Sequence, residues 1–574
     1  MEMLIANLAP IMFFGLVVLL GTGFPVAFAL AATGMVFGWV GVELGLVPAQ
    51  FFNALPLRLY GIMANDLLLA IPFFSLMGLI LERSRMAEDL LETIGQVFGP
   101  MRGGLAIAVV FVGALLAATT GVVAASVIAM GLISLPIMMR YGYNQPLAAG
   151  VITASGTLAQ IIPPSLVLIV IAEQFGQSVG EMYNAAFIPA FALVAIYAIT
   201  IMVIAVVRPS WVPALPLEAR TYREDSGTAG YTSLALLVVA SIAASWLVAM
   251  NYGALKTMTD GAPSATHPTD EIMEVLILAA ILFAFVVAII DKKLGLNLLS
   301  RLARQVTFVL IPPLMLVFLV LGTIFLGVAT PTEGGAMGAA GALILALARK
   351  RLTLSLFKQA LDSTARLSIF VMMILVGSTL FSLTFTAING NDWVKSLFGI
   401  VPGGEIGFVI FVSVLVFFLG LFLEFFEIAF ILLPLLLPVA QELGINLVYL
   451  GVLIGMVLQT SFLTPPVGFS LFYLSSVSSK TDYTDKVTRR RIKGMSTATI
   501  YKGATAFVAL QCVMVAIMIW KPGIVTYGLG EVKKLDVNSV NMNITPVEQE
   551  DEAAPTFGAK PPVGGNMPTA PTKP

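Results

Sequence analysis

The sequence is poor in the residues that most metal-binding and catalytic proteins use. Its 574 residues include one cysteine, Cys512, and one histidine, His267. A single cysteine excludes an intramolecular disulfide and a cysteine metal cluster. His267 lies in the polar stretch ATHPTD, where we expect an ordinary loop histidine. No GxxxxGK[ST] motif occurs, so the chain does not bind ATP through a P-loop.

Charge is scarce as well. Charged residues make up 11% of the chain, and 31 basic residues balance 32 acidic ones to a net charge of −1. Nucleic-acid binding needs a basic field, so we expect no nucleic-acid partner. Hydrophobic residues instead reach 58% and the mean hydropathy is +0.97, which excludes a soluble globular protein. The composition predicts a polytopic membrane protein in a lipid bilayer.

Apolar runs of about 18 residues define the expected spans, and Lys and Arg in the loops orient them. We expect spans at about residues 4–20, 26–42, 66–81, 183–207, 305–325, 334–348, 367–387 and 504–520, and a pair of spans within 231–291. Residues 43–65 are expected to lie partly along the interface. The basic loops 81–102 and 480–494 are expected in the cytoplasm, which places the N-terminus and the C-terminal tail in the periplasm. The N-terminal residues MEMLIANLAP lack a basic region, so we expect no cleaved signal peptide.

Two further spans are interrupted by paired prolines. GVITASGTLAQIIPPSLVLIVIA contains Pro163-Pro164, and LQTSFLTPPVGFSLFYL contains Pro465-Pro466. Proline removes a backbone donor and clashes with the preceding turn, so each pair should break its helix. In lipid such a break is tolerated only where protein or a polar cavity satisfies the freed backbone groups. A break near the bilayer midplane is therefore a candidate binding site.

Two apolar stretches are expected to form re-entrant hairpins. Residues 103–139 have Arg102 and Arg140 at their ends, which predicts a hairpin that enters from the cytoplasm with its tip at residues 119–126. Residues 407–440 have no Lys or Arg in their flanks, GGE and QELG, so this hairpin should enter from outside, with Glu424 and Glu427 in its centre.

Short motifs recur in order in the two halves of the chain. Leu135-Pro136 recurs as Leu437-Pro438, Gly142-x-Asn144 as Gly444-x-Asn446, and Pro163-Pro164 as Pro465-Pro466, each 302 positions later (438 − 136, 444 − 142, 465 − 163). The turn Gly21-x-x-x-Pro25 recurs as Gly327-x-x-x-Pro331. Because the two hairpins enter from opposite sides, the repeats are inverted, which is a transporter architecture.

We therefore predict an all-α polytopic membrane protein with inverted repeats, each with a re-entrant helical hairpin and a broken transmembrane helix. The expected parts are a first repeat (1–220), an inserted two-span segment with a connecting helix (221–304), a second repeat (305–525) and a disordered tail (526–574). The tail is rich in Pro, Gly and Ala.

The tip before SVIAMGLISLP, the break GTLAQIIPPS, the turn GVATPTEGGAMG and the break TPPVG resemble a known family. It is the large membrane subunit, M or DctM-type, of tripartite ATP-independent periplasmic (TRAP) transporters, and the resemblance covers roughly residues 1–220 and 305–521. It implies a sodium-driven importer of an organic acid in the bacterial inner membrane. It also implies two partners, a small four-span Q-type membrane subunit and a P-type periplasmic binding protein, and an elevator mechanism. No enzymatic activity is implied, and sodium ions serve as coupling ions without a further cofactor.

The chain departs from the family at both tips. Val122 and Val123 stand where the family usually has Ser and Gly, and Glu424 stands where an aspartate is common. The spans between residues 231 and 291 resemble an addition found in a larger variety of the subunit, and their role is open.

Sodium prefers oxygen ligands, which unwound backbone supplies without burying fixed charge. We therefore expect one sodium and substrate site between the first tip and the first break, and a symmetric site in the second half. The first comprises Thr119, Thr120, Gly121, Ser126, Gly156, Thr157, Pro163, Pro164 and Ser165. The second comprises Glu424, Glu427, Thr460, Ser461, Thr464, Pro465, Pro466 and Gly468. For each Ser and Thr, a bond back to its own helix or a bond between helices is an equal alternative.

Acidic residues have separate expected roles. Glu424 and Glu427 are three apart, hence neighbours on a helical face, where they could bind a cation, carry a proton or gate. The alternative is that both are solvated near the outer surface. Glu333 follows Pro331 and Thr332 in the turn that opens a helix, where an acid complements the helix N-terminus, so we expect a structural role.

A channel or an intramembrane enzyme fits the sequence less well than a transporter. A channel would need a continuous polar or charged lining. An enzyme would need a Ser/His or paired-Asp arrangement, which the spans lack. Among transporters, the alternative is a stand-alone sodium/dicarboxylate or anion symporter of the same fold superfamily. The substrate, the number of sodium ions and the oligomeric state do not follow from the sequence.

Overall fold

A computed structural model describes residues 5, 7–222, 230–252, 269–399, 401–485, 487–527 and 529. These residues belong to one compact unit, Met1–Leu529. Within the described ranges, nine helices are long and apolar enough to cross a membrane. His267 and the tail beyond residue 529 lie outside the described residues, so the expectations for them stay predictions.

The first half is a series of helices that covers the expected spans. Its elements are α2 (Leu8–Gly21), α3 (Val26–Glu43), η1 (Ala49–Ala54), α4 (Leu55–Met63), η2 (Asp66–Leu69), α5 (Ala70–Arg83), α6 (Met86–Phe98), α7 (Gly104–Thr120), α8 (Val123–Arg140), α9 (Gln145–Thr157), η3 (Leu158–Gln160), α10 (Leu166–Phe175), α11 (Val179–Val207), η4 (Pro209–Trp211) and η5 (Leu217–Ala219). The chain bends by 48° between the segments Gln50–Met63 and Asp66–Arg83, where Asn65 caps η2.

The second half adds the inserted pair of spans and repeats the hairpin and the broken span. Its elements are α12 (Tyr231–Met250), α14 (Thr269–Leu294), α15 (Arg301–Phe325), α16 (Pro331–Ala348), α17 (Leu354–Ala387), α18 (Gly390–Gly399), α19 (Gly404–Leu419), α20 (Phe425–Glu442), α21 (Leu447–Leu463), α22 (Phe469–Val477), β1 (Tyr483–Thr484), β2 (Arg491–Ile492), α23 (Thr497–Trp520) and α24 (Gly523–Thr526). The two short strands pair antiparallel within the basic segment 480–494.

The repeated Gly-x-Asn motif has the same structural task in both halves. Gly142 (φ 80°) and Gly444 (φ 71°) follow a hairpin arm in the left-handed region, which glycine adopts without a steric penalty. Asn144 and Asn446 then cap the next helix, and their side-chain oxygens accept from the amides of Leu147 (3.2 Å) and Tyr449 (2.9 Å). The motif therefore connects each hairpin to its broken span.

Three expectations about loops and boundaries were wrong. Residues 81–102 were expected as a charged loop, but they contain α6, which buries Met86, Leu90 and Ile94 on one face and places charged residues on the other. No helix was expected between the span at 367–387 and the hairpin at 407–440, but this stretch contains α18 (Gly390–Gly399). The span expected at 367–387 is part of the 34-residue helix α17, which begins at Leu354. The first turns of α17 were not predicted because they contain polar residues.

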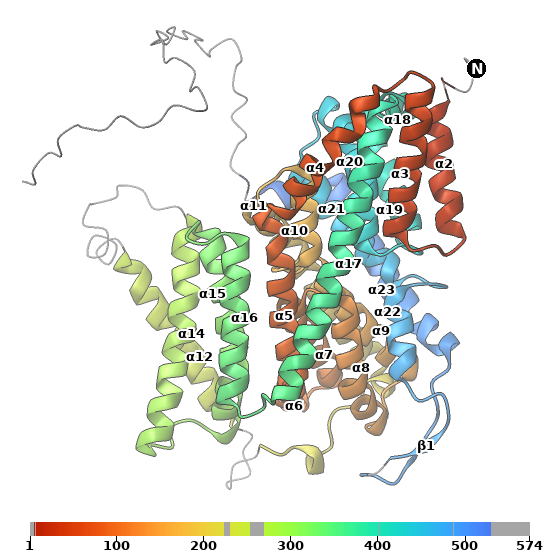
Figure 1. Cartoon of the computed structure of the whole chain (residues 1–574). Coiled ribbons are helices and arrows are strands. Elements are labelled where there is room, and N and C mark those ends of the chain that lie inside the picture. Colours follow the sequence, from red (N-terminus) through yellow and green to blue (C-terminus); the bar gives the residue numbers. More distant parts are fainter. Residues whose placement is uncertain are drawn as a thin grey trace, which may run out of the picture. The chain divides into compact units, whose positions relative to one another are not determined.

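The hairpins and broken spans interlock. Arm α8 of the first hairpin packs against α22 of the second broken span, and arm α20 of the second hairpin packs against α10 of the first. Helices α9 and α21 both pack on α23. Elsewhere α17 packs along α3 and α5, and α16 packs on α5 (Figure 1). The inserted helices α12 and α14 pack on each other and on α15, where Asp291 and Arg304 form an ion pair (2.7 Å).

Candidate functional site

The residues of the first break are buried in the protein. Residues 161–165 separate η3 from α10, and every residue from 147 to 172 is buried. The Ser165 hydroxyl donates to the Gln160 carbonyl (2.7 Å), and the Tyr183 hydroxyl, from α11, donates to the Ser165 carbonyl (3.4 Å). The peptide bond between Pro163 and Pro164 is cis. Protein hydroxyls thus satisfy backbone groups that a continuous helix would have paired.

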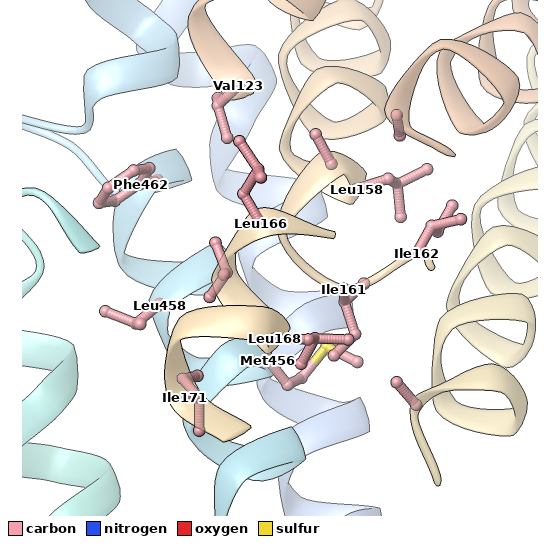
Figure 2. Packing of buried hydrophobic residues seen from close by; sticks show 14 of the residues in the cluster. Val123, Leu158, Ile161, Ile162, Leu166, Leu168, Ile171, Met456, Leu458 and Phe462 are labelled. Atoms are coloured by element: carbon pink, nitrogen blue, oxygen red, sulfur yellow. The ribbon is translucent and has the colours of Figure 1, made fainter. Parts of the chain in front are cut away.

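The first tip touches the first break, as the sequence predicts for a joint site. Gly121 (φ 60°) follows the last residue of α7, and an added Cβ there would lie 3.4 Å from the Leu166 amide nitrogen. An added Cβ at Gly156 would lie 2.3 Å from Val127 Cγ2. Figure 2 shows Val123 of the tip next to Leu166. The tip itself is shorter than expected, because α8 already begins at Val123 and includes Ser126.

The second break has the same parts in a more open setting. Residues 464–468 separate α21 from α22, and the Pro465-Pro466 peptide bond is cis. The Ser470 hydroxyl donates to the Phe462 carbonyl (2.8 Å), and the Tyr501 hydroxyl donates to the Pro466 carbonyl (2.6 Å). Pro466 is exposed. The tip of the second hairpin contacts α21 just before the break, because an added Cβ at Gly420 would lie 2.2 Å from the Ser461 hydroxyl oxygen.

Most hydroxyls assigned to the two sites donate to a carbonyl within their own helix. The bonds run from Thr119 to Leu116 (3.0 Å), Thr157 to Ala154 (2.9 Å), Thr460 to Met456 (3.0 Å), Ser461 to Leu458 (2.8 Å) and Thr464 to Thr460 (2.7 Å). Back-bonding uses the hydroxyl proton and leaves oxygen lone pairs for a cation. Thr120 is the last residue of α7. The contacts that join the hairpins to the broken spans are those of Gly121 with Leu166, Gly156 with Val127 and Gly420 with Ser461.

The expected arrangement of Glu424 and Glu427 was wrong. Glu424 is the N-cap residue of α20, outside the helix, and Glu427 is the third residue of that helix. The Glu427 carboxylate accepts from the Glu424 backbone amide (2.9 Å), so the pair shares a helix start rather than a helical face. Glu427 is buried and Glu424 is half-buried, which does not fit two solvated surface carboxylates.

Glu333 lies at the start of α16, which begins at Pro331. Its carboxylate accepts from the Thr330 amide (2.8 Å), and the Thr330 hydroxyl accepts from the Glu333 amide (3.3 Å), which forms a capping box. The Thr332 hydroxyl donates to the Asp66 carbonyl (2.6 Å). The turn thus ties the second repeat to η2 of the first.

A buried polar cluster behind the breaks was missed by sequence reasoning. Gln511 of α23 donates to the hydroxyl of Tyr197 in α11 (2.7 Å) and to that of Thr157 (3.4 Å). Gln459, which lies 302 positions after Thr157, is also fully buried, and its amide has no hydrogen-bond partner among the described residues. The same holds for the side-chain amide of Gln160. Their signal in the sequence was weak, because isolated Gln and Tyr residues in apolar runs carry no motif.

The comparisons with known proteins agree with this construction. The family model "Tripartite ATP-independent periplasmic transporter, DctM component" matches residues 13–524. The chain is 29% identical to the C4-dicarboxylate TRAP transporter large permease protein DctM of Pseudomonas aeruginosa over 431 residues, which cover 74% of this chain and 81% of the relative.

Two further similarities broaden the comparison. The chain is 22% identical to the sialic acid TRAP transporter permease protein SiaT of Haemophilus influenzae, over 80% of this chain and 59% of that protein. The solved structure of the Alcanivorax borkumensis YdaH transporter is similar with a TM-score of 0.50 at 11% identity, covering 84% of this chain and 88% of that one, which supports the fold alone.

Proposed function

The chain belongs to the DctM component family of tripartite ATP-independent periplasmic transporters, and from this premise we propose that it is a sodium-coupled importer subunit for an organic acid. As a member of that family it is a transporter permease in the inner membrane rather than an enzyme. The proposed part concerns the coupling ion, the solute, the partners and the motion.

The observation that carries the proposal is the pairing of each break with a hairpin tip. Each pairing combines unwound backbone with hydroxyl oxygens, and neither tip nor break contains Lys or Arg. Carbonyl and hydroxyl oxygens are ligands that sodium accepts and that cost less to bury than fixed charge. We therefore assign one sodium site to each break.

Three helix starts support the binding of a carboxylate between the breaks. Helices α8, α10 and α22 begin at a tip or a break without a side-chain cap, whereas Glu424 and Glu427 cap the start of α20. A helix N-terminus carries partial positive charge, and its first amides lack partners within the helix. With no basic side chain at these positions, bound sodium must supply the remaining positive charge, so substrate should bind well only after sodium.

The interlocked packing of hairpins and broken spans supports an elevator motion of one block. Arms α8 and α20 each pack on the broken span of the other repeat, which favours movement of the two hairpins and two broken spans as one block. Cysteine pairs that cross-link this block to α3 or α17 at two depths would support the elevator. Cross-links at a single depth would favour rocking.

The proposed partners are a small four-span membrane subunit and a periplasmic binding protein that delivers the solute. Relatives are named for C4-dicarboxylates and for sialic acid, both of which carry carboxylates. The basic inner loops orient the chain with its N-terminus and C-terminal tail outside.

Reconstitution in liposomes tests the proposal. The chain alone, the chain with the small subunit, and both with the binding protein are compared for uptake with an inward sodium gradient and with choline in its place. We expect uptake only with all three proteins and sodium. Equal uptake in choline would contradict sodium coupling, and full uptake by the chain alone would contradict the tripartite assignment.

A further inference from the structure

A cavity lined by both polar and apolar residues lies away from both breaks, next to the bent segment between α4 and η2. It measures about 600 Å³, a volume typical of sites for small organic ligands. Its walls come from α4 and η2, from the C-terminal end of α10, from α17 and from α20. It therefore lies between α17, outside the interlocked block, and two helices of that block.

The charges that line the cavity are one of each sign. Arg58 is the basic lining residue and Glu173 the acidic one. Among the described residues no carboxylate pairs with Arg58, whose side chain is exposed. The Glu173 carboxylate accepts a hydrogen bond from the Asn65 side-chain amide. The Arg58 guanidinium is therefore available to bind an anion. The Glu173 carboxylate already has a hydrogen-bond partner in Asn65.

One wall of the cavity is a row of hydroxyls. Ser378, Ser382 and Thr386 follow at intervals of four residues on α17, with Thr379 beside them, so they share one face of the helix. The Ser378 hydroxyl donates to the Leu375 carbonyl (3.0 Å), which leaves its oxygen free to accept a further hydrogen bond. Hydroxyls in this arrangement can accept from and donate to several hydroxyl groups of a ligand.

The position of the cavity fits a route from the outer side to the second tip. Helix α20 begins at the tip beside Glu424 and runs toward the outer surface in the proposed orientation. Phe430 and Pro434 of this helix line the cavity. At a rise of about 1.5 Å per residue, they lie roughly 9 and 15 Å outward of the tip.

We propose that this cavity is the outer access site for the transported solute, and that it selects a hydroxylated monocarboxylic acid. The inference rests on the proposed function, in which the solute arrives from outside. Arg58 would hold the single carboxylate, while the α17 hydroxyls, Gln174 and Glu173 would bind the solute's hydroxyl groups. An unsubstituted dicarboxylate fits less well, because its second carboxylate would meet Glu173 and leave the hydroxyls unmatched.

Charged thiol reagents test the cavity without knowledge of the natural solute. The full chain carries Cys512→Ser and Ser382→Cys in right-side-out membrane vesicles. It is treated with membrane-impermeant anionic (sulfonatoethyl) or cationic (trimethylammonioethyl) methanethiosulfonate. We expect modification from outside, and we expect Arg58→Ala to lower the anionic-to-cationic rate ratio about fivefold through the lost Coulomb attraction. Arg58→Lys should keep the ratio.

A matched control is Arg366→Ala, which removes an exposed arginine from the same helix α17, far from the cavity and paired with Asp362 (3.0 Å). It should leave the ratio unchanged. No modification from outside, or a ratio indifferent to Arg58, would overturn the assignment of the cavity. Such a result would leave sodium-driven uptake by the parent protein intact, so the two failures are distinguishable.

The class of solute is tested by protection of the same variant. Sodium gluconate, a hydroxylated monocarboxylate, and disodium succinate are compared at equal sodium concentration and ionic strength. We expect gluconate to slow modification of the cysteine introduced by Ser382→Cys at least about twofold more than succinate does, because only gluconate can form hydrogen bonds through its hydroxyl groups with the α17 hydroxyls. Equal protection, or stronger protection by succinate, would overturn the selection of a monocarboxylate.

Discussion

The two broken spans are built alike and surrounded differently. In both, a serine hydroxyl bonds back across the break and a tyrosine from the following span donates to a carbonyl of the break. The first break is buried throughout, whereas in the second Thr464 and Pro465 are half-buried and Pro466 is exposed. The same local chemistry can thus be held in a buried break or in a more exposed one, and in this conformation the second break has the greater solvent exposure.

The difference comes from the neighbours of each break. Figure 2 shows Met456 of α21 beside Ile161 and Leu168, so the second half of the chain packs over the first break. After the second break, the short helix α22 (Phe469–Val477) leads into the basic segment 480–494. The close packing around the first break and the solvent exposure of the second can therefore be tested separately.

The largest expected effect is at Gly156. A Cβ there would come within 2.3 Å of Val127 Cγ2 and 3.1 Å of the Val127 amide nitrogen, so Gly156→Ala must push the first tip away from its break. Overpacking of this kind costs about 1–3 kcal/mol. The matched variant is Gly455→Ala on α21, whose Cβ would meet Leu168 at an ordinary 3.4 Å. Thermal unfolding of both purified variants should show a clear loss only for Gly156→Ala, and equal losses would contradict a tightly packed first break.

Cysteine accessibility measures the openness of each break directly. In a Cys512→Ser background, Thr464→Cys should react with a small thiol reagent about tenfold faster or more than Thr157→Cys, because a fully buried side chain reacts only after local opening. Mass spectrometry after timed exposure gives both rates. Similar rates at the two positions would show that the breaks do not differ in solution.

The tyrosines beneath the breaks should differ in the same sense. Tyr183→Phe leaves the Ser165 carbonyl without this donor where water has no access, at a cost of about 1–2 kcal/mol. Tyr501→Phe should cost less, because water can reach the Pro466 carbonyl at an exposed residue. The comparison uses thermal unfolding under identical detergent conditions. A larger loss for Tyr501→Phe would reverse the expected order.

The smallest effects are expected at the bases of the two hairpins. Arg140, at the end of the first hairpin, forms an ion pair (3.1 Å) with the buried Asp485 of the basic segment 480–494. Glu442, at the end of the second hairpin, forms an ion pair (2.8 Å) with Lys395 in an exposed position. Burial alone would raise the pKa of Asp485, but hydrogen bonds from Thr488 and Arg140 outweigh it and lower the pKa to about 2.

A folded-state pKa below the unfolded value of about 3.9 makes a stabilising contribution that is present above that pH. The contribution is lost as the pH falls from about 4 toward 2. Asp485→Asn should therefore lower the melting temperature at pH 7 and weaken the acid dependence below pH 4, while Lys395→Ala should change stability by less than about 0.5 kcal/mol. An unchanged acid profile for Asp485→Asn would contradict the buried pair.

The parts of the fold that were predictable are those fixed by local chemistry. Paired prolines break a helix wherever they occur, and a glycine followed two residues later by an asparagine ends one helix and caps the next, so the breaks and the repeat could be read from the chain. Helix α6 was missed because its charged face dominates the composition of residues 81–102. Tyr183, Tyr501 and Gln511 were missed because their partners lie on other helices, and a single sequence does not show those contacts. The spacing of Glu424 and Glu427 could not reveal which of them lies inside the helix.

Direct binding of radioactive ²²Na⁺ to the purified full-length chain tests the central claim that each break holds a sodium ion. The parent chain is compared with the double variants Thr157→Val, Ser165→Ala at the first break and Ser461→Ala, Thr464→Val at the second. We predict saturable sodium binding that excess potassium does not displace, with each double variant losing one of two ions. Absent saturable binding, or the same stoichiometry in all three proteins, would contradict a sodium site at each break.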